Sequence, residues 1–116
     1  MLYQEAYDAY YQEDYKRAVE CFSKLVVLEP FFARSWRGFA ASLQQEKRYE
    51  EALKGWAMLT LIDSSAESHL YAAECLIALG QKQEALKALT VAEKETLMPE
   101  WEKKICYLRK ICDSTH

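Results

Sequence analysis

Tyrosines are concentrated at the N-terminal end of this 116-residue sequence, where five of the eight lie in YQEAYDAYYQEDY, residues 3–15. A tyrosine ring contributes a large apolar surface, and its hydroxyl group needs a hydrogen-bond partner when it is buried. The chemistry that such a cluster offers is recognition by ring packing and hydrogen bonding. The tyrosines therefore belong either to a core or to a surface that a partner covers.

The side chains that commonly perform catalysis or bind metals form no constellation here. The four cysteines include no C-x-x-C pair, and the two histidines complete no metal-ligand spacing. His69 is expected to be a hydrogen-bonded packing residue, and Cys75 a packed thiol in the segment AAEC. An enzyme would need a nucleophile with a base, paired carboxylates or a metal cluster. We therefore expect no catalysis, no metal, no cofactor, and reduced cysteines that are mostly buried.

Apolar residues recur at helical spacing along most of the chain. The segments RAVECFSKLVVLEP, EALKGWAMLTLID and EALKALTVAEK each place apolar side chains at i, i+3 or i+4, and i+7. Only three glycines and two prolines interrupt the sequence, and no useful stretch alternates with period two. The sequence therefore predicts an all-α fold.

These helical segments are copies of one unit. A spacing of 34 residues separates three pairs of similar residues, namely Tyr15 and Tyr49, Ala18 and Ala52, and Phe22 and Trp56. The next copy is one residue shorter, because Ala52 and Ala85 are 33 residues apart. Repetition near 34 residues with two helices per unit is the signature of the tetratricopeptide repeat.

The repeats divide the chain into three units within one domain, residues 1–116. They span about residues 1–31, 32–65 and 66–96, and each contains two helices joined by a short turn. A further helix over 99–112 is predicted after Pro99, because proline is favoured in the first turn of a helix. Its apolar stripe suits a cap on the last repeat of a right-handed superhelix, and comprises Trp101, Ile105, Leu108 and Cys112.

The first helices of stacked repeats line the concave face of such a superhelix. Tyr3, Tyr7 and Tyr10 lie at i, i+4 and i+7 on one such face, whereas Tyr15 is expected in the core. The predicted groove residues are Tyr3, Tyr7, Tyr10 and Tyr11 in unit one, Arg34, Arg37, Ala41, Gln44 and Gln45 in unit two, and Leu70, Tyr71, Glu74 and Ile77 in unit three. The alternative is that the tyrosines pack against a helix preceding residue 1.

Charge and hydropathy exclude several other classes of protein. The net charge of −3 gives no electrostatic case for nucleic acid, and no run of about 18 apolar residues predicts a membrane span. The acidic, aromatic N-terminus does not look like a signal peptide, so we expect a cytosolic chain. Arg34 and Arg37 are the only basic groove residues, and Glu74 opposes them, which argues against a carboxylate clamp. An extended peptide with apolar anchors, stiffened by proline, fits this groove better.

The sequence resembles the class II chaperones of bacterial type III secretion, which hold translocator proteins. The resemblance covers about residues 2–96 and rests on LYQEAYDAYYQEDYKRAVECFSKLVVLEP, RGFAASLQQEKRYEEALKGWAMLTLID and HLYAAECLIALGQKQEALKAL. The AAEC tract followed by the shortened third repeat is the most distinctive part.

The resemblance implies three tetratricopeptide repeats and a chaperone without catalytic activity in the bacterial cytoplasm. It implies that the concave groove binds an extended N-terminal segment of a hydrophobic translocator, typically of the form P-x-L-x-x-P, and keeps it soluble and competent for secretion. Tyr3, Tyr7 and Tyr10 would form the pockets; Leu70, Tyr71 and Ile77 would close the far wall. A gatekeeper of the secretion machine is a further partner that the resemblance leaves open, through the convex surface or the C-terminal helix.

The chain departs from the family at its N-terminus. Family members usually carry a further N-terminal helical stretch that is often used in dimerisation, whereas this chain begins almost inside its first helix. The resemblance therefore leaves a homodimer open. The competing interpretation is a generic tetratricopeptide scaffold or co-chaperone that binds a partner's peptide tail, and the salt dependence of binding separates the two.

Overall fold

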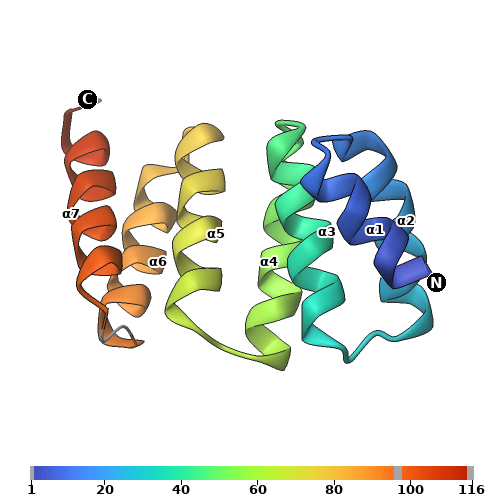
Figure 1. The fold of residues 1–116 in the computed structure, drawn as a ribbon. Helices are drawn as coiled ribbons and strands as arrows, with labels where there is room; N and C mark the ends of the chain where they lie inside the picture. The colour runs from blue at the N-terminus through green and yellow to red at the C-terminus, as the bar shows by residue number, and fades with distance from the viewer. Residues whose placement is uncertain (1, 96–97, 115–116) are drawn as a thin grey trace.

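The computed structural model describes residues 2–95 and 98–114, which form seven α-helices and no strand (Figure 1). The helices are α1 (Leu2–Tyr11), α2 (Tyr15–Leu28), α3 (Ala33–Gln45), α4 (Tyr49–Ile62), α5 (Ala66–Ala78), α6 (Lys82–Glu95) and α7 (Pro99–Ser114). The prediction of an all-α fold built from pairs of helices is confirmed.

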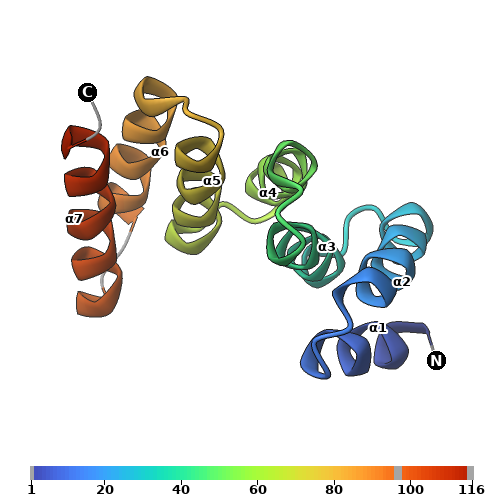
Figure 2. The ribbon, with the colours of Figure 1, turned by 90° about the horizontal axis from the view of Figure 1, so that it is seen from above.

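The helices follow one another as antiparallel pairs in an arc that measures 44 × 25 × 21 Å (Figure 2). Helices α1, α3, α5 and α7 lie on the inner side of the arc, and α2, α4 and α6 lie on its outer side. Each helix packs on the next one in the chain, and α1 also contacts α3 as α5 contacts α7. The inner side is therefore lined by the first helix of each pair.

The turns within the three pairs share one backbone geometry. A residue with positive φ follows the first helix of each pair, namely Glu13 and Lys47 at 62° and Gly80 at 77°. The spacing of these residues, 34 and then 33, repeats that of the sequence. A left-handed residue is a common way to end a helix, and glycine adopts this conformation at the lowest cost. The repeat is thus preserved in the turns as well as in the apolar stripes.

Small residues occupy the places where helices approach most closely. A Cβ atom at Gly38 would collide with the ring of Phe22, which is fully buried. A Cβ atom at Gly55 would lie 2.9 Å from the Cβ of Ala40. Glycine lowers helix propensity by about 1 kcal/mol relative to alanine, so close packing of α2, α3 and α4 explains these two residues.

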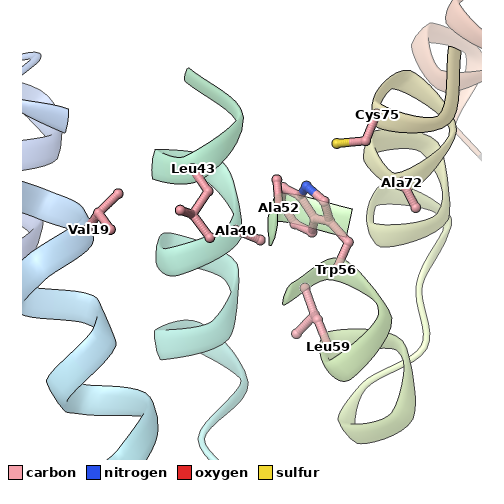
Figure 3. Close-up of a cluster of buried hydrophobic side chains, with 8 residues drawn as sticks. All are labelled: Val19, Ala40, Leu43, Ala52, Trp56, Leu59, Ala72 and Cys75. Atoms are coloured by element: carbon pink, nitrogen blue, oxygen red, sulfur yellow. The ribbon is translucent and has the colours of Figure 1, made fainter. Parts of the chain in front are cut away.

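The largest buried side chain is the indole of Trp56, which joins the second and third repeats. It belongs to a cluster of buried residues drawn in Figure 3: Val19, Ala40, Leu43, Ala52, Trp56, Leu59, Ala72 and Cys75. The indole packs in the same cluster as Ala40 of α3 and Ala72 and Cys75 of α5. The core therefore runs continuously through the stacked repeats.

Helix α7 covers the end of the third repeat, as predicted. Ile105, Leu108 and Cys112 are buried against α5 and α6, and Trp101 is half-buried beside them. Of the four cysteines, three are buried, whereas Cys106 of α7 is exposed. None of the described helices has the length and apolarity that a membrane crossing requires.

Candidate binding groove

A cavity of about 240 Å³ opens on the inner side of the arc. Helices α1, α3, α4 and α5 supply its lining, which consists of Tyr7, Tyr10, Tyr11, Arg37, Gly38, Ala41, Gln44, Gln45, Trp56, Glu67 and Tyr71. Eight of these residues are among those that the sequence placed in the groove. The structure therefore brings together the central part of the predicted row, from the tyrosines of α1 to Tyr71 of α5.

Tyr3 and Arg34 lie beyond one end of the cavity, one turn from its lining residues. The Tyr3 ring is 4.9 Å from that of Tyr7 and 5.8 Å from that of Phe32, measured between centroids. The Arg34 guanidinium group lies 5.5 Å from the centre of the Tyr3 ring, at cation–π distance. These two residues extend the aromatic surface of the groove without lining the cavity itself.

The third repeat departs from the expected row. Leu70 is fully buried among α5, α6 and α7, and Ile77 packs into the same part of the core. Glu74 pairs with Lys104 of α7, whose Nζ atom lies 3.4 Å from Oε1. These three predicted residues face α6 and α7 rather than the cavity, because α7 covers that stripe of α5. The groove-facing row of α5 contains Glu67 and Tyr71 instead.

Three lining residues were not predicted for the groove. Trp56 was assigned to the core through its equivalence with Phe22, and it is in fact both buried and part of the cavity wall. Gly38 carries no side chain that a pattern of apolar residues could reveal. Glu67 lies four residues before Tyr71, so a helical row through Tyr71 is the signal that would have found it.

The tyrosines of α1 form one wall of the groove through contacts between rings. Tyr7 packs edge-on against Phe22 at 5.0 Å, and Tyr10 packs edge-on against Tyr15 at 5.5 Å, between centroids. Tyr15 is half-buried rather than fully in the core. Tyr11 leaves 76% of its surface exposed beside these rings. This wall offers an apolar, rigid surface to a partner.

Burial raises the pKa of two phenol groups of this wall. Desolvation is the main cause that raises the pKa of Tyr7 to about 12, and it also raises the pKa of Tyr10. The Tyr7 hydroxyl donates a hydrogen bond to the backbone oxygen of Arg34, at 3.0 Å. Both groups therefore remain uncharged further into the alkaline range than a free tyrosine does.

Aromatic stacking forms the opposite wall. Tyr71 stacks on Trp56 with ring centroids 5.0 Å apart and an interplanar angle of 18°. Two residues of α7 also contact Tyr71: Lys104 Nζ lies 4.8 Å from the ring centre, and Trp101 packs edge-on at 6.5 Å. Burial raises the pKa of Tyr71 as well. Helix α7 thus supports a groove residue as well as covering the last repeat.

The charged side chains at the groove are paired within the protein. Arg37 of α3 lies 3.5 Å from Glu67 of α5, between Nε and Oε1. Because this ion pair joins neighbouring inner helices, it neutralises the cationic side chain of the cavity lining. A ligand with a charged tail would meet a groove whose charges are already compensated.

One polar side chain bridges the second and third repeats at this cavity. The Oε1 atom of Gln44 accepts hydrogen bonds from Trp56 Nε1 at 2.8 Å and from Cys75 Sγ at 3.4 Å. Burial is the main cause that raises the pKa of Cys75 to about 12, so its thiol stays protonated and can donate. Gln44 therefore satisfies two buried donors.

Within the described residues no group of histidine, cysteine and acidic side chains is arranged to bind a metal ion. His69 is partnered as expected, with Nε2 3.2 Å from Ser64 Oγ and 3.9 Å from Glu95 Oε2. Ser64 also donates to Glu95. This cluster ties the α4–α5 connection to the end of α6.

Comparison with known proteins finds similarity to tetratricopeptide-repeat proteins. A tetratricopeptide-repeat family model matches residues 3–58. Low calcium response locus protein H of Yersinia pestis is 29% identical over 94 residues, which are 80% of this chain and 56% of that protein. The chain thus spans little more than half the length of this curated relative.

Solved structures extend the similarity to nearly the whole chain. The type III secretion chaperone SycD of Yersinia enterocolitica, in complex with a peptide of the translocator YopD, is 25% identical with a TM-score of 0.85, over 97% of this chain and 88% of that one. A chain of the CopN–Scc3 complex is 27% identical with a TM-score of 0.82, over 99% and 67%.

The fold is also shared with a different class of protein. The TPR2B domain of yeast Sti1, in a complex with pHsp70, has a TM-score of 0.89 at 18% identity, over 99% of this chain and 95% of that one. At this identity the likeness shows the fold alone. SycD and the Sti1 domain share this fold, so differences between their functions must come from particular residues and not from the fold.

Proposed function

We propose that this tetratricopeptide-repeat domain, whose solved neighbours include type III secretion translocator chaperones, binds an extended segment of a hydrophobic translocator protein in its concave groove. Binding would keep the translocator soluble and competent for secretion in the bacterial cytoplasm. The observation that carries the proposal is a cavity with aromatic walls and internally paired charges. The similarity of this chain to SycD, whose structure was solved with a translocator peptide, supports the same proposal.

The size of the cavity fits one part of such a segment. Its volume of about 240 Å³ is below the range of about 300–1,000 Å³ that encloses a drug-sized ligand. One apolar side chain would occupy the cavity, between Tyr10 on α1 and Tyr71 on α5. The rest of the segment would lie along the concave surface, where the exposed ring of Tyr11 and the uncovered part of the half-buried Tyr3 ring add apolar area.

The chemistry of the walls favours a proline-containing segment of the form P-x-L-x-x-P. Aromatic rings pack well on proline and leucine, and a polyproline-like segment loses little conformational entropy on docking. The groove residues in the described part of the chain form no catalytic constellation, so we propose a binding role without enzymatic activity.

Replacement of Tyr10 by alanine tests this proposal. We expect wild type to bind acetyl-Pro-Ala-Leu-Ala-Ala-Pro-amide, and Tyr10→Ala to bind it roughly 5- to 30-fold more weakly, the range for an aromatic hot-spot residue. Titration calorimetry measures both affinities. Tyr107→Ala is the matched control, because Tyr107 lies on α7 outside the cavity with 63% of its surface exposed. Equal binding by wild type and Tyr10→Ala would contradict the groove assignment.

A gatekeeper of the secretion machine is a second proposed partner, on another surface. The likeness to a chain of the CopN–Scc3 complex supports it. Large apolar side chains outside the cavity are also exposed, among them Val27, Leu28, Phe31 and Leu61. Copurification of the chain with a candidate gatekeeper, with Leu61→Asp as the variant, tests this proposal, and undiminished copurification by the variant would contradict this surface.

A further inference from the structure

The amide group of Gln44 has one defined orientation. The nitrogen and oxygen of a glutamine amide look alike in shape, so hydrogen-bond partners must distinguish them. An indole N–H can only donate, and Trp56 Nε1 lies 2.8 Å from one amide atom of Gln44, which must therefore be the oxygen. The Cys75 thiol, 3.4 Å from the same oxygen, is a second donor. Two residues from different repeats thus fix the direction of the amide.

The amide nitrogen of Gln44 is left without a partner. Within residues 2–95 and 98–114 no hydrogen bond involves Gln44 Nε2, although two N–H bonds are available there. Gln44 is half-buried and lines the cavity, between the tyrosines of α1 and the Trp56–Tyr71 stack. An acceptor that enters the cavity can pair with this donor, whose direction is already set by the two hydrogen bonds of the amide oxygen.

The other polar groups of the cavity lining are paired within the protein, free to rotate or, in the case of Gln45, exposed to solvent. The Tyr7 hydroxyl donates to the backbone oxygen of Arg34, and Arg37 pairs with Glu67. The hydroxyls of Tyr10 and Tyr71 can rotate about their C–O bonds, so they are not oriented in advance. Gln44 is thereby distinguished as a fixed neutral donor at the cavity.

The matching ligand group is a main-chain carbonyl. An extended or polyproline-like segment makes no internal hydrogen bonds, so its carbonyl oxygens remain available. Proline residues also lack the N–H group, which makes such a segment richer in acceptors than in donors. We propose that Gln44 donates its amide hydrogens to a main-chain carbonyl of the bound segment and so fixes which residue enters the cavity. The proposal rests on the proposed function of the groove.

A pair of matched variants tests this role. Gln44→Glu keeps an acceptor for Trp56 and Cys75 but removes the amide donor, and Gln12→Glu makes the same charge change at an exposed residue outside the cavity lining. We expect acetyl-Pro-Ala-Leu-Ala-Ala-Pro-amide to bind Gln44→Glu roughly tenfold more weakly than wild type, as for loss of one hydrogen bond. Gln12→Glu should change affinity less than about threefold. Equal weakening by both variants would attribute the effect to charge and overturn the proposal.

Nuclear magnetic resonance can detect whether the side-chain amide of Gln44 gains an acceptor when the peptide binds. The side-chain amide signals of Gln44 are identified as those missing from the ¹⁵N–¹H spectrum of Gln44→Glu. We expect these signals to shift on addition of the peptide to wild type, because the N–H bonds gain an acceptor. Peptide binding that leaves them in place would overturn the proposal.

The outcomes also separate this inference from the function on which it rests. Loss of binding in Tyr10→Ala together with full binding by Gln44→Glu would retain the groove and reject the role of Gln44. Absence of binding to wild type would reject the proposed function and this inference with it. A thermal unfolding midpoint of Gln44→Glu within about 2 °C of wild type would show that the substitution leaves the stability of the fold nearly unchanged, so weaker peptide binding could not be attributed to unfolding.

Discussion

Tyr7 belongs to the core and to the groove at the same time. Its ring packs on Phe22, its hydroxyl bonds to the backbone of Arg34, and part of its surface lines the cavity. Because burial raises its pKa, the residue also makes the stability of the fold depend on pH. A side chain that serves a binding surface therefore has a measurable effect on folding.

We expect the protein to lose stability in alkali partly through Tyr7. The pKa of a free tyrosine is about 10, whereas that of folded Tyr7 is raised to about 12. Above pH 10 the unfolded chain therefore loses this proton first and is favoured, so stability falls as the pH rises toward 12. Tyr7→Phe should be less stable than wild type by about 0.5–1.5 kcal/mol near pH 8, through the lost hydrogen bond. The difference should shrink near pH 11.

Urea denaturation at the two pH values measures this difference. Tyr107→Phe serves as the control, because Tyr107 is an exposed tyrosine of α7. A gap between wild type and Tyr7→Phe that stays constant between the two pH values would contradict the proposed effect of burial on Tyr7.

The cavity-lining residues of α1 could be placed from the sequence because they follow one helical row. Tyr7 and Tyr10 line the cavity with the parts of their rings that Phe22 and Tyr15 leave uncovered. Trp56 was missed because its repeat equivalent, Phe22, is purely a core residue. The repeat pattern assigns each position a single environment. It therefore cannot reveal a residue, such as Trp56, that is buried in the core and also lines a cavity.

Helix α7 affects the groove at the scale of an element. Helix α7 packs on α5 and α6 as a capping helix is predicted to do. Two of its residues, Lys104 and Trp101, also contact the ring of Tyr71. The same helix covers Leu70, Glu74 and Ile77, which were predicted for the groove. Alignment of the repeats does not predict which residues of α5 the capping helix covers, because the angle at which that helix packs depends on side-chain packing between helices.

Replacement of Lys104 tests the contribution of α7. Lys104→Met keeps the aliphatic stem but removes the cation over Tyr71 and the ion pair with Glu74. We expect a loss of about 1 kcal/mol in stability, as typical of a cation–π contact together with a partly exposed ion pair. We also expect weaker peptide binding, since Tyr71 lines the cavity. Chemical denaturation and calorimetric titration measure the two effects.

Lys103→Met is the matched control on the neighbouring residue of α7. Lys103 is exposed, and no ion pair of Lys103 is found in the described part of the chain. Its replacement should change stability by less than about 0.5 kcal/mol. Indistinguishable effects of the two variants would contradict the support that Lys104 gives to Tyr71.

At the scale of the whole molecule, charge pairing predicts how binding responds to salt. Arg37 is paired with Glu67 and Lys104 with Glu74, whereas Arg34 lies over Tyr3. Peptide affinity should therefore change less than about threefold between roughly 0.05 and 0.5 M sodium chloride, although the Debye length falls from about 14 to 4 Å over this range. Calorimetric titration of the hexapeptide at several salt concentrations measures this response.

A scaffold that grips a charged peptide tail would behave differently. Its affinity would fall steeply with salt, because cations that contact a carboxylate are screened when they are exposed. A tenfold or greater loss over the same range would therefore favour the generic co-chaperone interpretation over an apolar-anchored segment.

The contact between the second and third repeats has a mechanical consequence. Helices α1 and α3 pack on each other, as do α5 and α7, whereas α3 and α5 are joined by side chains, through the Arg37–Glu67 ion pair and the Gln44–Cys75 hydrogen bond. The part formed by α1–α4 is thus connected to that formed by α5–α7 by the packing of α4 on α5 and by these side-chain contacts. We expect the molecule to bend most easily at this connection, because fewer contacts join the two parts there than join the helices within each part.

The cavity lies across this connection, with Tyr10 on one piece and Tyr71 on the other. Bending there would change the distance between these two walls. We therefore expect the width of the cavity to vary most in the molecule without a bound peptide. A bound segment would act as a strut between the two pieces and raise the bending stiffness of the arc.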